Sequence, residues 1–108
     1  MTRADPIAAA LAAVLNRLPS PASRRSYASD WQHYVEWLAA RKKTPLKRTP
    51  RDVADYVTSL RAAGKKKTTT ARALSVVRMI YGALVLDGAI PTNPAREVKN
   101  PRADHTPK

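Results

Sequence analysis

The sequence contains no cysteine, and this absence excludes several kinds of site. Without thiols there are no disulfides, no thiolate nucleophile and none of the usual cysteine-based zinc clusters. Glycine is also scarce, and three in 108 residues are too few for a loop that cradles phosphates through its backbone. The two histidines, His33 and His105, lie far apart in the chain. We therefore expect no metal, no cofactor and no catalytic residues in this chain.

Long hydrophobic runs are missing as well, because every apolar stretch is far shorter than the roughly 18 residues of a membrane span. The segment Met1–Leu18 is rich in alanine, but Asp5 and Pro6 stand where a signal peptide has its basic and apolar regions. The lack of cysteine agrees with a reducing compartment. These features predict a cytoplasmic protein with no membrane partner.

Acidic residues are few, with 8 Asp and Glu against 20 Lys and Arg, and the formal net charge is +12. Such a surplus of one sign disfavours a compact chain unless a polyanion neutralises it. Nucleic acid is therefore the leading partner class, and an anionic membrane surface is the second.

Helix starts are easy to find, because four capping side chains stand directly before a proline, the preferred pairing at the N-terminus of a helix. These pairs are Asp5-Pro6, Ser20-Pro21, Thr49-Pro50 and Asn93-Pro94. Asp52, three residues after Thr49, completes a near capping box.

Apolar residues recur at spacings of three and four after each of the first three starts and again before Asp87. The second helix has an aromatic stripe centred on Trp31, and the last long helix has an aliphatic stripe centred on Val77. Gly64 suits the C-cap of the third helix. The pattern predicts a single all-α domain of four main helices and a short fifth, at Pro6–Leu18, Pro21–Arg41, Pro50–Ala63, Thr69–Leu86 and Pro94–Val98.

Two basic regions stand out. In the first, Lys65, Lys66 and Lys67 precede a helix whose outer face is small and polar, with Thr68 and Arg72 in its first turns. The N–H groups and positive dipole end of such a helix favour phosphate contacts. The second region, Arg41–Arg51, has six basic residues and no acid, but two prolines prevent a continuous helix there.

Four segments, in order, resemble the core-binding domain of tyrosine recombinases, the family of phage integrases and their bacterial relatives. Ser20–Leu38 is similar to the opening motif of that domain through Ser20, Ser23, Tyr27, Asp30, Trp31, Val35, Trp37 and Leu38. Thr49–Leu60 is similar to the next motif, and Thr68–Leu84 to the helix that follows. Gly88–Pro101 is similar to the ending that leads into the family's catalytic domain.

This resemblance implies a SAM-like bundle, two helix pairs crossed at a steep angle, that forms half of a clamp around double-stranded DNA. It implies that the second and fourth helices face the DNA. On the second helix it points to Ser23, Arg24 and Arg25; on the fourth it points to Thr68, Thr69, Arg72 and Ser75.

The resemblance also implies a division of labour. The family's catalytic Arg, Lys, His and Tyr belong to a second domain, and no tyrosine of this chain matches the nucleophile, so strand cleavage is expected in a longer parent protein. We expect residues 1–19 to form an N-terminal helix and linker, 20–100 the DNA-binding domain, and 101–108 a tail towards that catalytic domain. The expected partners are double-stranded DNA, the catalytic domain of the same parent and other recombinase protomers on the DNA.

Two alternatives remain at this stage. The third helix, the turn at Gly64 and the fourth helix also fit a helix-turn-helix regulator, although the predicted turn is longer than the usual three or four residues. The basic surface also fits a protein-interaction module in which charge serves solubility. Salt-sensitive binding to duplex DNA separates both DNA-binding hypotheses from this last one.

Overall fold

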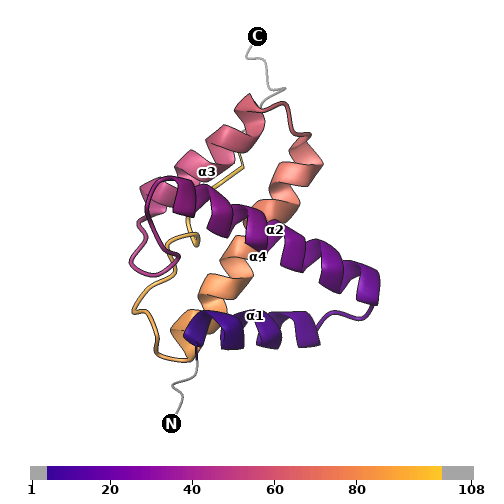
Figure 1. Ribbon diagram of the computed structural model, residues 1–108, viewed down its shortest axis with the longest axis vertical. Coiled ribbons are helices and arrows are strands. Elements are labelled where there is room, and N and C mark those ends of the chain that lie inside the picture. Colours follow the sequence, from indigo (N-terminus) through magenta and orange to yellow (C-terminus); the bar gives the residue numbers. More distant parts are fainter. Residues whose placement is uncertain (1–4, 101–108) are drawn as a thin grey trace.

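The computed structural model describes residues 5–100, which form four helices, α1 (Pro6–Asn16), α2 (Pro21–Ala40), α3 (Pro50–Ala62) and α4 (Lys67–Leu86). These residues contain no strand. Figure 1 shows α1 and α2 lying across α4, while α3 joins the start of α4 through a short connection. The predicted all-α bundle of four main helices is confirmed, and the predicted tail at 101–108 lies outside the described residues.

The first three predicted helix starts are confirmed by their hydrogen bonds. The side chains of Asp5, Ser20 and Thr49 each accept a hydrogen bond from a backbone N–H in the first turn, and a proline follows each of them. At α3 the cap is reciprocal, because the Asp52 carboxylate also accepts the N–H of Thr49 at 3.0 Å. These starts depend on neighbouring residues alone, so the sequence was sufficient to locate them.

The predicted fifth helix is wrong, since Pro94–Glu97 forms turns with hydrogen bonds between residues three apart. Asn93 does accept the N–H of Ala95 at 2.8 Å, as a cap would. A side chain of α4 also binds this segment. Arg78 of α4 donates to the carbonyls of Ala95 and Val98 at 3.2 and 2.6 Å. This segment is therefore attached to α4 through an arginine and does not continue as a helix.

Helix α4 is the centre of the bundle, because it packs against α1, α2 and α3. Its predicted stripe is buried, together with Thr70 and Ala73 on the same face and Val76 and Ala83 on a neighbouring face. Trp31 and Val77 are both buried, as their stripes predicted. Helix α4 is long and apolar enough to cross a membrane by length and composition, but half of that stretch is buried inside the bundle, as expected of a core helix.

A chain of buried hydroxyl groups connects the core to the segment before α3. Tyr81 donates its hydroxyl proton to the Pro45 carbonyl at 2.7 Å, so Tyr34 is the donor in the 2.7 Å contact between the two tyrosines. Both rings lie within an aromatic cluster with Trp31 and Tyr56. Pro45 is consequently buried, and the segment around it is fixed to the core.

The predicted C-cap at Gly64 is confirmed by its φ of +87° and by two hydrogen bonds that close the end of α3, from Gly64 to the Arg61 carbonyl and from Lys65 to the Leu60 carbonyl. Helix α4 then begins at Lys67, earlier than predicted. The hydroxyl of Thr70 donates to the Lys66 carbonyl at 3.0 Å, which is a bond within a helix. Only residues 63–66 connect the two helices.

Candidate nucleic-acid interface

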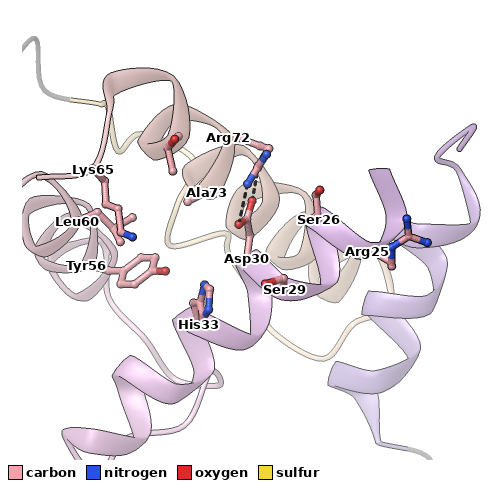
Figure 2. Close-up of a pocket in the computed structure, with 11 residues that line it drawn as sticks. Arg25, Ser26, Ser29, Asp30, His33, Tyr56, Leu60, Lys65, Arg72 and Ala73 are labelled. Carbon is pink, nitrogen blue, oxygen red and sulfur yellow. Dashed lines mark hydrogen bonds and ion pairs between the residues drawn. The ribbon is translucent and has the colours of Figure 1, made fainter. Parts of the chain in front are cut away.

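The first turns of α4, the first half of α2 and the end of α3 enclose an open cleft of about 400 Å³ (Figure 2). We call it the basic cleft, because Arg25, Lys65 and Arg72 are among its lining residues. Its other lining residues are Ser26, Ser29, Asp30, His33, Tyr56, Leu60, Thr69 and Ala73. The cleft therefore gathers four residues that were expected to bind DNA, namely Arg25, Lys65, Thr69 and Arg72.

An ion pair between α2 and α4 lies in the basic cleft. The Nε and Nη2 atoms of Arg72 donate to the two carboxylate oxygens of Asp30 at 2.7 and 3.2 Å (Figure 2). Asp30 is buried, whereas the Arg72 side chain is 47% exposed. The hydrogen bonds that Arg72 donates to Asp30 raise the pKa of the Arg72 guanidinium above its ordinary value. The arginine is thus fixed at one edge and open to solvent at the other.

The start of α4 presents lysines and threonines to solvent. Lys65, Lys66, Lys67, Thr68 and Thr69 are all exposed. Lys66 is the N-cap residue, and α4 is the only one of the four described helices that has no side-chain hydrogen bond at its cap. The side chain of Lys65 extends into the cleft towards Tyr56 (Figure 2). Positive side chains and the positive end of the helix dipole therefore coincide at this end of the bundle.

At the start of α2, two of the three expected residues make bonds inside the protein. Ser23 takes part in the cap of α2, because its N–H donates to the Ser20 hydroxyl oxygen at 3.1 Å. Arg24 donates from Nη1 to the Leu18 carbonyl at 2.8 Å and so fastens the connection from α1. Arg25 is exposed at the edge of the cleft. Ser23, Arg24 and the half-buried Ser75 of α4 do not line the cleft.

Sequence reasoning missed the polar residues of α2 that line the cleft. Ser26, Ser29 and His33 recur at spacings of three and four, a polar stripe that was available as a signal. The pairing of Asp30 with Arg72 had no such signal, because 42 positions separate the two residues. Among residues 5–100, no group of three or more histidine and acidic side chains is placed to hold a metal ion.

The second basic region, Arg41–Arg51, uses most of its cations internally, and we call it the basic segment. Asp52 accepts Lys43 Nζ at 2.9 Å and Arg48 Nη1 at 3.1 Å. The hydrogen bond from Lys43, followed by that from the Thr49 backbone, lowers the pKa of Asp52 to about 2. Arg51 pairs with Asp55 at 3.3 Å.

Aromatic packing occupies one more cation of the basic segment, because the Arg41 guanidinium lies 4.0 Å from the centre of the Trp37 ring. Trp37 in turn contacts Tyr56. Lys42 and Lys47 are the two exposed cations that remain, and both have a positive φ, 62° and 64°.

Three of the four tyrosines are poor nucleophiles in this environment. Burial raises the pKa of Tyr34 to about 12 and, together with the nearby charge of Asp30, raises the pKa of Tyr56 to about 12. Burial and the contact with Tyr34 raise the pKa of Tyr81 still further above its ordinary value. These hydroxyls remain protonated, and they serve packing and internal hydrogen bonds.

Comparison with known proteins identifies related sequences. The family model described as the phage integrase N-terminal SAM-like domain matches residues 12–88. The chain is 27% identical over 88 residues to tyrosine recombinase XerD of Chlorobaculum tepidum, a match that covers 82% of this chain and 29% of that protein. It is 33% identical over 76 residues to tyrosine recombinase XerC of Thermodesulfovibrio yellowstonii, covering 70% and 24% of the two chains. The matched region is thus less than a third of each relative, and no solved structure matches.

Proposed function

The chain belongs to the family of phage integrase N-terminal SAM-like domains, and from this membership we propose that it binds double-stranded DNA as part of a tyrosine-type site-specific recombinase or integrase. The observation that carries the proposal is the basic cleft. Lys65 and the half-exposed Arg72 lie there with the start of α4, which has no side-chain cap, and the exposed Lys66 and Lys67 follow Lys65 in the chain. This is the combination that duplex phosphates and groove edges require.

We assign the phosphate contacts to Lys65, Lys66, Lys67, Thr68 and Thr69 at the start of α4, and to Arg25 at the start of α2. All six are exposed. Ser23, Arg24 and Ser75 remain weaker members of the expected interface, because the first two already form internal hydrogen bonds. Phosphate contacts of this kind set affinity and register and carry no sequence information by themselves.

In the finer proposal, residues 20–100 grip one side of the duplex as half of a clamp, and residues 1–19 supply the helix that packs beneath α4. The other half is a catalytic domain of the same parent protein, reached through residues 101–108, and further protomers assemble on the DNA. We place this activity in the cytoplasm. The strand-cleaving residues belong to that other domain, because Tyr34, Tyr56 and Tyr81 are buried and protonated.

The helix-turn-helix alternative loses the counterargument that was based on the length of the turn. The connection between α3 and α4 has four residues, 63–66, so the expectation of a longer turn is wrong. Family membership nevertheless favours the recombinase reading, since the match extends over α1 and α2 as well as the α3–α4 pair.

A salt titration tests the proposal. If five to seven phosphates are contacted, the logarithm of the affinity for a labelled duplex falls against the logarithm of salt with a slope of roughly −5 to −6. We expect weak binding near physiological salt, because half a clamp leaves the far side of the duplex uncovered. A slope near zero favours the protein-interaction module instead.

A further inference from the structure

Arg72 differs from the other cations of the basic cleft because it forms an ion pair with Asp30. Asp30 occupies one edge of the guanidinium by accepting from Nε and Nη2. Within the described residues, both hydrogens of Nη1 and the second hydrogen of Nη2 have no partner; one hydrogen of each nitrogen points outward along the free edge, while the other Nη1 hydrogen points back towards Cδ. Two parallel N–H groups on that edge match an acceptor that offers two lone pairs side by side.

A guanine edge suits this arrangement better than a phosphate does. The carboxylate of Asp30, 2.7 Å from Arg72, offsets the positive charge that would attract a phosphate. A phosphate at the free edge would also experience the negative charge of Asp30, whereas a guanine presents neutral O6 and N7 acceptors. Lys65 and Lys66, which form no ion pair among the described residues, are the better phosphate ligands.

The position of Arg72 in α4 agrees with this role. It lies in the second turn, past the lysines, and its side chain is about half exposed in the cleft. When a helix enters the major groove, the residues of its first turns reach the base edges. The lysines at the very start of α4 then lie nearer the backbone of the DNA.

We propose that Asp30 and Arg72 form a base-reading unit, in which Asp30 is a positioning residue and the free edge of Arg72 pairs with O6 and N7 of a guanine in the major groove. The proposal rests on the proposed duplex binding and adds a determinant of sequence preference to it. Fixing the guanidinium in advance reduces the side-chain entropy that a long arginine loses on binding.

The experiment begins with the unmodified chain and a randomised duplex library. We expect one enriched guanine, and a binding preference of at least about fivefold for that duplex over one with adenine at the same position. Replacing this guanine with 7-deazaguanine removes the N7 acceptor and should abolish most of the preference. This probe needs no protein variant, so it does not depend on any variant folding.

Two conservative variants then test the pair. Arg72→Lys keeps the charge but lacks the fork, and Asp30→Asn removes the fixed carboxylate. Both should reduce the preference to within about twofold, whatever the change in overall affinity. The matched controls are Arg51→Lys and Asp55→Asn, which alter an exposed ion pair of α3 in the same way and should keep the preference. Thermal midpoints monitor folding.

The outcomes distinguish a failure of the base-reading unit from a failure of the proposed duplex binding. No salt-dependent binding to any duplex by the unmodified chain would overturn the proposed function. Salt-dependent binding without an enriched guanine, or a preference that survives 7-deazaguanine, would overturn the base-reading unit alone. So would a preference retained by folded Arg72→Lys and Asp30→Asn, which would leave the pair a structural bridge between α2 and α4.

Discussion

The basic segment and the basic cleft show that the number of positive charges in a region does not predict whether that region is free to bind. The basic segment has six cations in eleven residues, but Asp52, Asp55 and the Trp37 ring engage four of them. The basic cleft has fewer cations, and one acid, Asp30, which pairs with Arg72. Lys65 and Lys66 are exposed and form no ion pair within residues 5–100.

The few acids of this chain determine which of its surplus cations form ion pairs inside the fold. Asp52 is largely buried and tied to the cap of α3, so its two cations stabilise the fold. The hydroxyl chain from Tyr34 through Tyr81 to the Pro45 carbonyl fixes the same segment from the other side. A region fixed at both sides by internal contacts contributes to stability, whereas the start of α4 is exposed.

The largest effect is expected at the acid of the basic segment. Asp52→Ala removes the reciprocal cap and two ion pairs and leaves the mostly buried Arg48 without its partner. We expect a loss of about 3 kcal/mol in the free energy of unfolding, measured by urea denaturation at neutral pH. Asp55→Ala, which breaks an exposed pair, should cost no more than about 0.5 kcal/mol. Equal losses in the free energy of unfolding would show that Asp52 and Asp55 stabilise the fold equally, which would contradict the expected difference between them.

A second effect follows from the pKa of Asp52, lowered from 3.8 to about 2. Because the folded pKa lies below the unfolded one, the ionised group stabilises the fold fully above about pH 4, and that contribution is lost as the pH falls towards 2. The loss amounts to about 2 kcal/mol and is read from urea midpoints between pH 5 and 2. Asp52→Asn should remove this part of the pH dependence. An unchanged profile in that variant would contradict the assignment.

Two double variants, each of which removes two positive charges, test the difference between the start of α4 and the basic segment. Lys65→Gln with Lys66→Gln should weaken duplex binding by at least about tenfold at 0.1 M salt and reduce the salt slope by roughly 2, because about two phosphate contacts are lost. Lys42→Gln with Lys47→Gln should change affinity by less than about twofold. Fluorescence anisotropy on one duplex measures both. Equal losses would indicate diffuse electrostatics, and a larger loss from the second pair would refute the basic cleft as the DNA face.

The smallest effect concerns Lys42, which ends α2 with a positive φ in the position that favours glycine. Its N–H and that of Lys43 close the helix on the carbonyls of Ala39 and Leu38. Lys42→Gly should raise the free energy of unfolding by about 0.5 kcal/mol, because relief of the strained conformation exceeds the added freedom of the unfolded chain. Lys42→Ala removes the same charge and should give no gain. Neither should alter duplex binding, and a loss in both would assign Lys42 to the interface.

The local features of this fold could be predicted from the sequence, and the tertiary ones could not. The caps at Asp5, Ser20 and Thr49 and the turn at Gly64 depend on residues within a few positions of each other. The stripes around Trp31 and Val77 follow from helical periodicity. Asn93-Pro94 shows the same local signal, yet the segment after it forms turns, and Arg78 from α4 binds the Ala95 and Val98 carbonyls there.

The candidate site also has local residues that could be predicted from the sequence and tertiary ones that could not. Lys65, Thr69 and Arg72 were identifiable from the start of α4, and all three line the cleft. Their neighbours Asp30 and His33 come from α2, and only packing brings them there. Sequence reasoning also treated Arg24 as a surface residue, whereas it donates to the Leu18 carbonyl. The bond crosses the turn between α1 and α2, and no capping or periodic signal in the sequence indicates it.

The boundary between exposed and buried residues along α4 has an evolutionary consequence. The five positions from Lys65 to Thr69 are all exposed, and burial begins at Thr70. Substitutions at exposed positions change the free energy of unfolding little, so they rarely bring a marginally stable domain below the stability it needs. This end of the helix can therefore accept substitutions while the rest of α4 preserves the bundle.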